Sequence, residues 1–114
     1  MTDLIGRLAA ATGPDRELDA EIARACGYSG DFGWFTPPGG GRLVRCPKFT
    51  ASIDAALTLL PEGKMWLFGH LDPEDMRFFA TITDGRVLGD ETWRGFHATP
   101  AIALVLAILK ARQP

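Results

Sequence analysis

Apolar residues recur at helical spacing in the first 26 positions of the chain. Leu4, Ile5 and Leu8 predict a short helix that ends at the turn-forming residues 12–14. Thr12 is then expected to cap a second helix, because proline is tolerated in a first helical turn. The apolar positions of this second helix fall every three to four residues and its charged residues face the other way, which predicts an amphipathic surface helix.

Two further helices follow near the middle and at the end of the chain. Thr50 or Ser52 caps a helix over residues 53–60, and Thr99 followed by Pro100 opens one that reaches residues 110–112. The last helix is apolar on nearly all sides, which predicts burial on more than one face. One of its stripes is formed by Ala101, Leu104 and Ile108. We expect this stripe to meet another helix or, as a homodimer interface, a second subunit.

Strand patterns occupy the region between the third and fourth helices. Residues 64–71 place Met65 and Leu67 on one face and Trp66 and Phe68 on the other, with both faces expected to be at least partly covered. Residues 77–83 alternate in the same way, and Asp84-Gly85 predicts a tight turn into a returning strand that reaches about residue 93 or 97. We therefore predict a single α+β domain spanning residues 1–114: an α/β sandwich with a small antiparallel sheet between helices, about four helices and three or more strands.

Residues 27–49 are interrupted by glycine and proline and predict a long loop, with a ragged hairpin formed by residues 32–35 and 43–46. Aromatic and arginine side chains concentrate in this loop, as they do at protein–protein hot spots and on single-stranded nucleic-acid platforms. The candidate binding residues are Phe32, Trp34, Phe35, Arg42 and Arg45. The alternative is that these aromatic residues fold over the sheet edge as part of the core.

Composition and charge narrow the classes of partner. Hydrophobic residues make up 46% of the chain, as in globular proteins. The formal charge of −2 disfavours a nucleic-acid partner, which would need a local basic patch. Residues 101–109, the most apolar run, are too short to cross a membrane, and charged residues interrupt the apolar N-terminal stretch. We expect a cytoplasmic protein without membrane contact, in which Cys26 and Cys46 are reduced thiols, although one disulfide between them remains an alternative.

Candidate catalytic and metal-binding groups have simpler structural explanations. His70, Asp72, Glu74 and Asp75 lie close together in sequence, but their spacing matches no ligand motif and suits a solvated turn. His97 precedes a helix start, and neither serine lies in a nucleophile motif. Gly39-Gly40-Gly41 lacks the lysine and the following helix of a phosphate-binding loop. We predict no catalytic residue, no metal site and no cofactor.

Three segments, taken together, resemble a known family. Residues 12–23 read TGPDRELDAEIA, residues 49–61 read FTASIDAALTLLP and residues 98–104 read ATPAIAL. In this order they are similar to the landmarks of the phage ABA sandwich domain. The resemblance implies a small protein of a phage or prophage, with an antiparallel sheet between helical layers. It implies no catalytic residues, and it covers residues 27–48 least well.

The sequence thus favours a binding role over chemistry. We expect a non-enzymatic phage or prophage protein that binds another, unidentified protein through the aromatic loop. One alternative is an inhibitor of a bacterial defence system of the anti-CRISPR type. The other is a structural or assembly protein that forms a homo-oligomer through the last helix.

Overall fold

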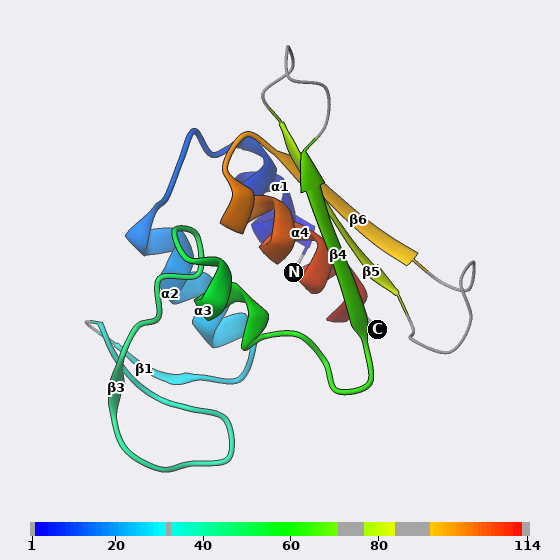
Figure 1. The fold of residues 1–114 in the computed structure, drawn as a ribbon. Helices are drawn as coiled ribbons and strands as arrows, with labels where there is room; N and C mark the ends of the chain where they lie inside the picture. The colour runs from blue at the N-terminus through cyan, green and yellow to red at the C-terminus, as the bar shows by residue number, and fades with distance from the viewer. Residues whose placement is uncertain (1, 32, 71–76, 84–91, 113–114) are drawn as a thin grey trace.

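The computed structural model describes residues 2–31, 33–70, 77–83 and 92–112, which form four helices and two three-stranded antiparallel sheets (Figure 1). The helices are α1 (Thr2–Ala10), α2 (Arg16–Ala25), α3 (Ile53–Leu57) and α4 (Pro100–Arg112). The first sheet contains β1 (Ser29–Asp31), β2 (Trp34–Thr36) and β3 (Val44–Arg45); the second contains β4 (Met65–His70), β5 (Phe78–Thr83) and β6 (Thr92–His97). The predicted α+β class is confirmed. The predicted turn at Asp84-Gly85 lies outside the described residues.

The elements are stacked in layers, with the two sheets far apart. α4 packs on β5 and β6, and α1 and α3 pack on α4. α2 contacts α1 and leads to the small β1–β2–β3 sheet on the far side of the helices (Figure 1). Since all four of these helices lie on one side of the β4–β5–β6 sheet, the opposite face of that sheet carries no helix within the described part of the chain.

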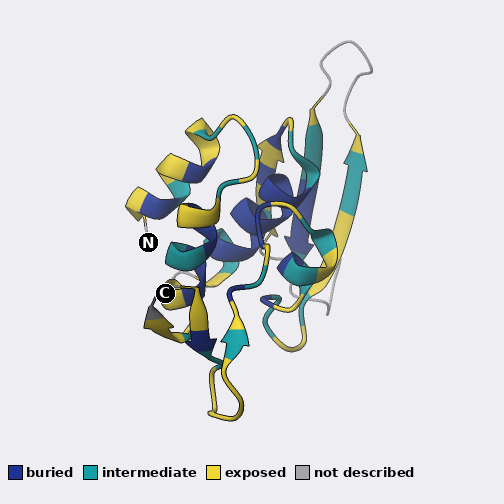
Figure 2. Ribbon diagram, turned by 90° about the vertical axis from the view of Figure 1, so that its left-hand side faces the viewer, coloured by how far each residue is buried: buried dark blue, intermediate teal, exposed yellow. Residues whose placement is uncertain are grey.

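α4 forms the centre of the core. Nine consecutive residues from Ala101 to Leu109 are buried, and Figure 2 shows the helix coloured accordingly. Ala101 is 2% exposed, and Leu104 and Ile108 are 0% exposed. The predicted homodimer interface on this stripe is therefore wrong, because the sheet and the other helices cover both sides of α4 within the same chain. In the described ranges no helix is long and apolar enough to span a membrane.

Gly95 of β6 sets how closely α4 approaches the sheet. A Cβ atom built on Gly95 would lie 2.2 Å from the carbonyl oxygen of Ala103 and 2.8 Å from the amide nitrogen of Ala107. Only a residue without a side chain leaves room for the helix backbone at this position. The close contact also brings α4 onto β5, where Ala80 and Ile82 are completely buried.

Helix caps differ in part from the sequence prediction. Asp15, rather than Thr12, caps α2: its carboxylate accepts hydrogen bonds from the backbone N–H groups of Glu17 and Leu18. Ser52 caps α3 as one of the two predicted residues. Aspartate at this position satisfies otherwise unpaired N–H groups and carries a charge that suits the helix dipole, which favours it over a threonine placed one turn earlier.

A buried polar network ties α2 to the segment before α3. Asp19 is 1% exposed, and its Oδ1 accepts hydrogen bonds from both the backbone N–H and the hydroxyl of Thr50, each at 2.8 Å. Arg16 donates to the other Asp19 oxygen at 2.7 Å and to the carbonyl oxygen of Cys46 at 2.8 Å. These contacts fix the chain that leaves β3 against α2, and so they position the small sheet.

Candidate functional site

The small sheet places neighbouring residues of β2 on opposite faces. Trp34 is opposite Asp31 of β1 and Arg45 of β3, whereas Phe35 is opposite Gly30 of β1 and Val44 of β3. Directly opposed residues of antiparallel strands share a face, so Trp34 and Arg45 lie on the outer face and Phe35 and Val44 on the inner one. A Cβ on Gly30 would lie 2.2 Å from the Trp34 carbonyl oxygen, so glycine is required for β1 to approach β2.

An exposed tryptophan dominates the outer face. Trp34 is 48% exposed, and the Arg45 guanidinium carbon lies 5.2 Å from the centroid of its ring. This cation–π contact orients the indole while leaving much of it in solvent. Arg42 and Leu43 lie on the segment that enters β3, and Leu43 is 62% exposed. We refer to Trp34, Arg42, Leu43 and Arg45 as the tryptophan surface.

Three of the five predicted binding residues are exposed in the structure. Trp34, Arg42 and Arg45 are exposed. Phe35 was wrongly predicted as a binding residue: it is 0% exposed, and the Arg24 guanidinium lies 5.6 Å from its ring centroid. The physical reason is the strand alternation, which turns one of two consecutive aromatic residues inward. Phe32 lies outside the described residues.

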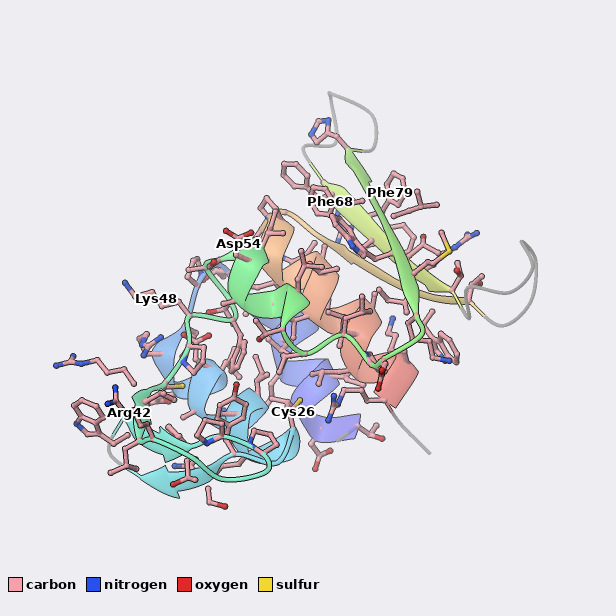
Figure 3. The ribbon with its side chains drawn as sticks, turned by 60° about the horizontal axis from the view of Figure 1, so that its bottom comes forward. Cys26, Arg42, Lys48, Asp54, Phe68 and Phe79 are labelled. Carbon is pink, nitrogen blue, oxygen red and sulfur yellow. The ribbon has the colours of Figure 1, made fainter. Side chains whose placement is uncertain are left out.

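Positive charge accumulates around the tryptophan surface. Residues 32–53 contain no acidic residue and three basic ones, namely Arg42, Arg45 and Lys48. Figure 3 shows Arg42 and Lys48 on the same side of the molecule. Arg16 adds a guanidinium next to the Cys46 carbonyl, although its charge is partly balanced by Asp19. This segment therefore carries a local excess of basic residues despite the net charge of −2 of the chain, although the strand partner of Trp34 in β1 is the acidic Asp31.

The outer face of the β4–β5–β6 sheet is a second exposed apolar region, which the sequence analysis missed. Met65 is 60% exposed, Leu67 is 58% exposed and Phe96 is 42% exposed. Phe79 lies between them, with its ring over Gly69, and Figure 3 shows Phe68 and Phe79 on opposite faces of the sheet. The expectation that both faces of residues 64–71 are covered fails here, because the described helices contact only the inner face.

The two histidines lie in different environments. His97 is buried; the Thr99 N–H donates to its Nδ1 at 2.8 Å, so Nε2 carries the proton and donates to the Ala11 carbonyl oxygen at 2.7 Å. His70 is exposed and its ring contacts that of Phe78 at 4.8 Å. Both nitrogens of His97 are thus used to join the end of β6 to the residue after α1, a structural role.

Metal ligands do not gather in the part of the chain that the structure describes, where no group of three or more histidine, cysteine or acidic side chains could hold an ion. The predicted acidic turn with Asp72, Glu74 and Asp75 lies outside the described residues. Cys26 and Cys46 are free thiols, and burial raises the pKa of both. A raised pKa lowers the thiolate fraction at neutral pH, which makes both thiols poor nucleophiles.

An open depression of about 250 Å³ lies between the end of α1 and the start of α2. Its lining comprises Arg7, Ala10, Ala11, Asp15 and Leu18. The Arg7 guanidinium is paired with Glu21, and the Asp15 carboxylate caps α2. The polar groups of this depression are therefore already engaged in holding the helices, and they offer no reactive pair to a substrate.

Comparison of the chain with protein-family models, with curated proteins and with solved structures found no match. The resemblance to the phage ABA sandwich domain stays a prediction from the residues themselves. Any functional conclusion must come from the chemistry of the exposed surfaces.

Proposed function

We propose that this chain is a non-enzymatic binding module that docks onto an acidic surface of another protein through its tryptophan surface. The observation that carries the proposal is the half-exposed Trp34, which the Arg45 guanidinium contacts, together with the exposed Leu43 in the segment that enters β3. Tryptophan and arginine are the residue types most enriched among the side chains that dominate protein–protein binding energy.

The size of the contribution follows from the exposed area. Tryptophan has about 200 Å² to bury, so the 48% exposure of Trp34 leaves roughly 100 Å² for a partner to cover. At ~25 cal/mol per Å² this burial is worth about 2.5 kcal/mol. The Arg45 contact reduces the cost of ordering the indole, because the ring is already oriented before binding.

Charge favours an acidic partner. The basic residues Arg42, Arg45 and Lys48 are exposed, and they outnumber the one acidic residue next to Trp34 in the sheet, its strand partner Asp31. Such a surface attracts a partner rich in aspartate and glutamate and repels a basic one. The resemblance to a phage domain supports a phage or prophage origin, in which case the partner is a bacterial protein.

The test is capture of proteins from a nuclease-treated bacterial lysate by the purified chain. Wild type is compared with Trp34→Ser and with Phe96→Ser, a matched control because Phe96 is an aromatic residue that is 42% exposed but lies on β6 of the other sheet. We expect a protein that wild type and Phe96→Ser retain and Trp34→Ser loses. Binding should weaken when the salt concentration rises to ~500 mM, because salt screens exposed charges.

Two results would count against this role. If Trp34→Ser captures the same proteins as wild type, the tryptophan surface does not bind them. If capture occurs only in lysate that has not been treated with nuclease, and the chain binds a single-stranded oligonucleotide directly, the basic residues bind nucleic acid and not an acidic protein.

A further inference from the structure

β4 is an edge strand with unusual properties. In the sheet order β4-β5-β6, it pairs only with β5 within the described part of the chain. Its six residues, Met65–His70, include no proline and no lysine, arginine or acidic residue. Met65 and Leu67 are 60% and 58% exposed on its outer face, and Trp66 is 41% exposed on its inner face. A long apolar edge of this kind is a template for pairing with another strand.

The opposite edge of the same sheet is protected. On β6, the Lys110 ammonium of α4 donates a hydrogen bond to the Arg94 carbonyl oxygen at 2.8 Å, and the Arg94 side chain is itself charged and exposed. Charged residues at an edge, lysine above all, are a common protection of natural sheets against unwanted pairing. The sheet thus has one edge, β6, that carries charged groups and one edge, β4, that is apolar and carries none.

We propose that β4 of a second copy of this chain pairs with β4 in antiparallel orientation, which forms a homodimer with a continuous six-stranded sheet. A twofold axis perpendicular to the sheet relates the two copies and keeps both outer faces on the same side. Directly opposed residues of an antiparallel pair share a face, so the axis must pair outer residues with outer ones and inner residues with inner ones.

The register centred on Leu67 satisfies this requirement within the strand. Leu67 then lies opposite the partner's Leu67, and Trp66 lies opposite the partner's Phe68 on the inner face. Met65 lies opposite the partner's Gly69, where the ring of Phe79 provides an apolar surface in each copy. Residues 65–69 thus form only apolar opposed pairs, while His70 lies opposite the partner's Lys64 at each end of the paired segment. No acidic residue and no two lysines or arginines oppose each other, which is why a second copy of this chain suits the edge.

This inference is independent of the proposed function. The tryptophan surface belongs to the β1–β2–β3 sheet, which lies beyond the helices from β4 (Figure 1). It also differs from the dimer predicted through α4, because the α4 stripe is buried within the chain. A dimer through β4 leaves both tryptophan surfaces open, so Trp34→Ser should not change the oligomeric state.

Sedimentation equilibrium over a range of protein concentrations tests the dimer. We expect wild type to be dimeric, and Leu67→Lys to raise the dimer dissociation constant ~100-fold, because the twofold axis loses two leucines and opposes two like charges. Phe96→Lys is the matched control: it also places a lysine at an exposed apolar position of the outer face, but on β6. We expect Phe96→Lys to dimerise like wild type.

Two variants of opposite charge distinguish a loss of β4–β4 pairing from a loss of folding. Leu67→Lys and Leu67→Glu should each be monomeric alone and should form a mixed dimer when combined, since opposite charges then face each other. A wild type that remains monomeric at ~100 µM would overturn the proposal. A Leu67→Lys variant that dimerises as tightly as wild type would also overturn it, because the interface would then lie elsewhere.

Discussion

Replacing Gly95 with alanine tests how closely α4 and the β4–β5–β6 sheet are packed. The new methyl group would lie 2.2 Å from the Ala103 carbonyl oxygen, about 1.2 Å short of the 3.4 Å at which ordinary contact begins. Backbone atoms of a buried helix cannot rotate away, so α4 must move from the sheet. Overpacking of this kind costs up to ~3 kcal/mol, and we expect Gly95→Ala to reach that value because nine residues of α4 are buried.

Thermal and urea unfolding measure the effect, and a loss of ~3 kcal/mol corresponds to a melting temperature lower by ~10 °C for a domain of this size. Gly69→Ala is the control. Its methyl group would lie 2.6 Å from a ring carbon of Phe79, but this ring is the end of a side chain on the open face and can swing aside. We expect a cost below ~1 kcal/mol there. Equal destabilisation by the two variants would refute the packing argument.

Three further predictions concern buried polar groups. Asp19→Asn should lower the free energy of unfolding by ~2 kcal/mol. One oxygen of Asp19 accepts from Thr50 and the other from Arg16, and asparagine keeps only one acceptor oxygen. An unchanged urea midpoint would contradict this prediction. Cys26 and Cys46 should react with a thiol reagent at pH 8 at least ~10-fold more slowly in the native than in the unfolded chain, since burial raises both pKa values and leaves less thiolate; equal rates would show that the thiols are accessible. His97→Leu should cost ~1–3 kcal/mol in urea unfolding, because a partly buried carbonyl and a partly buried N–H lose their partner. Wild-type stability of this variant would refute the structural role of His97.

Local patterns allowed most elements to be predicted. The alternation of Met65, Trp66, Leu67 and Phe68 identified β4, and the Thr99-Pro100 start identified α4. Residues 32–35 and 43–46 were expected as a weak hairpin, and β2 and β3 do pair there. These signals are local because turn geometry and strand period depend on neighbouring residues.

Long-range packing could not be predicted in the same way. An all-round apolar α4 fits burial between layers as well as it fits a subunit interface, and only the positions of the sheet and of α1 and α3 decide between them. Thr50 has the chemistry of a helix cap, but its partner is Asp19, 31 positions earlier in the chain. The outer face of the β4–β5–β6 sheet has the pattern of a covered face, and its exposure follows from where the helices pack.

Trp34 and Phe35 show what sequence can and cannot say about the candidate site. Two consecutive aromatic residues on a strand must face opposite sides, so one of them had to be buried. Which one points inward depends on the Gly30 contact that brings β1 against β2 and on the network that holds the chain after β3 to α2. The arginines were predictable as surface residues because their charge resists burial.

The affinity of the captured partner for purified variants tests the central proposal most directly. Measured by titration calorimetry, Trp34→Ser should bind the partner ~50- to 100-fold more weakly than wild type, which corresponds to the roughly 2.5 kcal/mol expected from burial of the exposed indole. Phe96→Ser should bind it with wild-type affinity. Equal affinity of Trp34→Ser and wild type would contradict a binding role for the tryptophan surface.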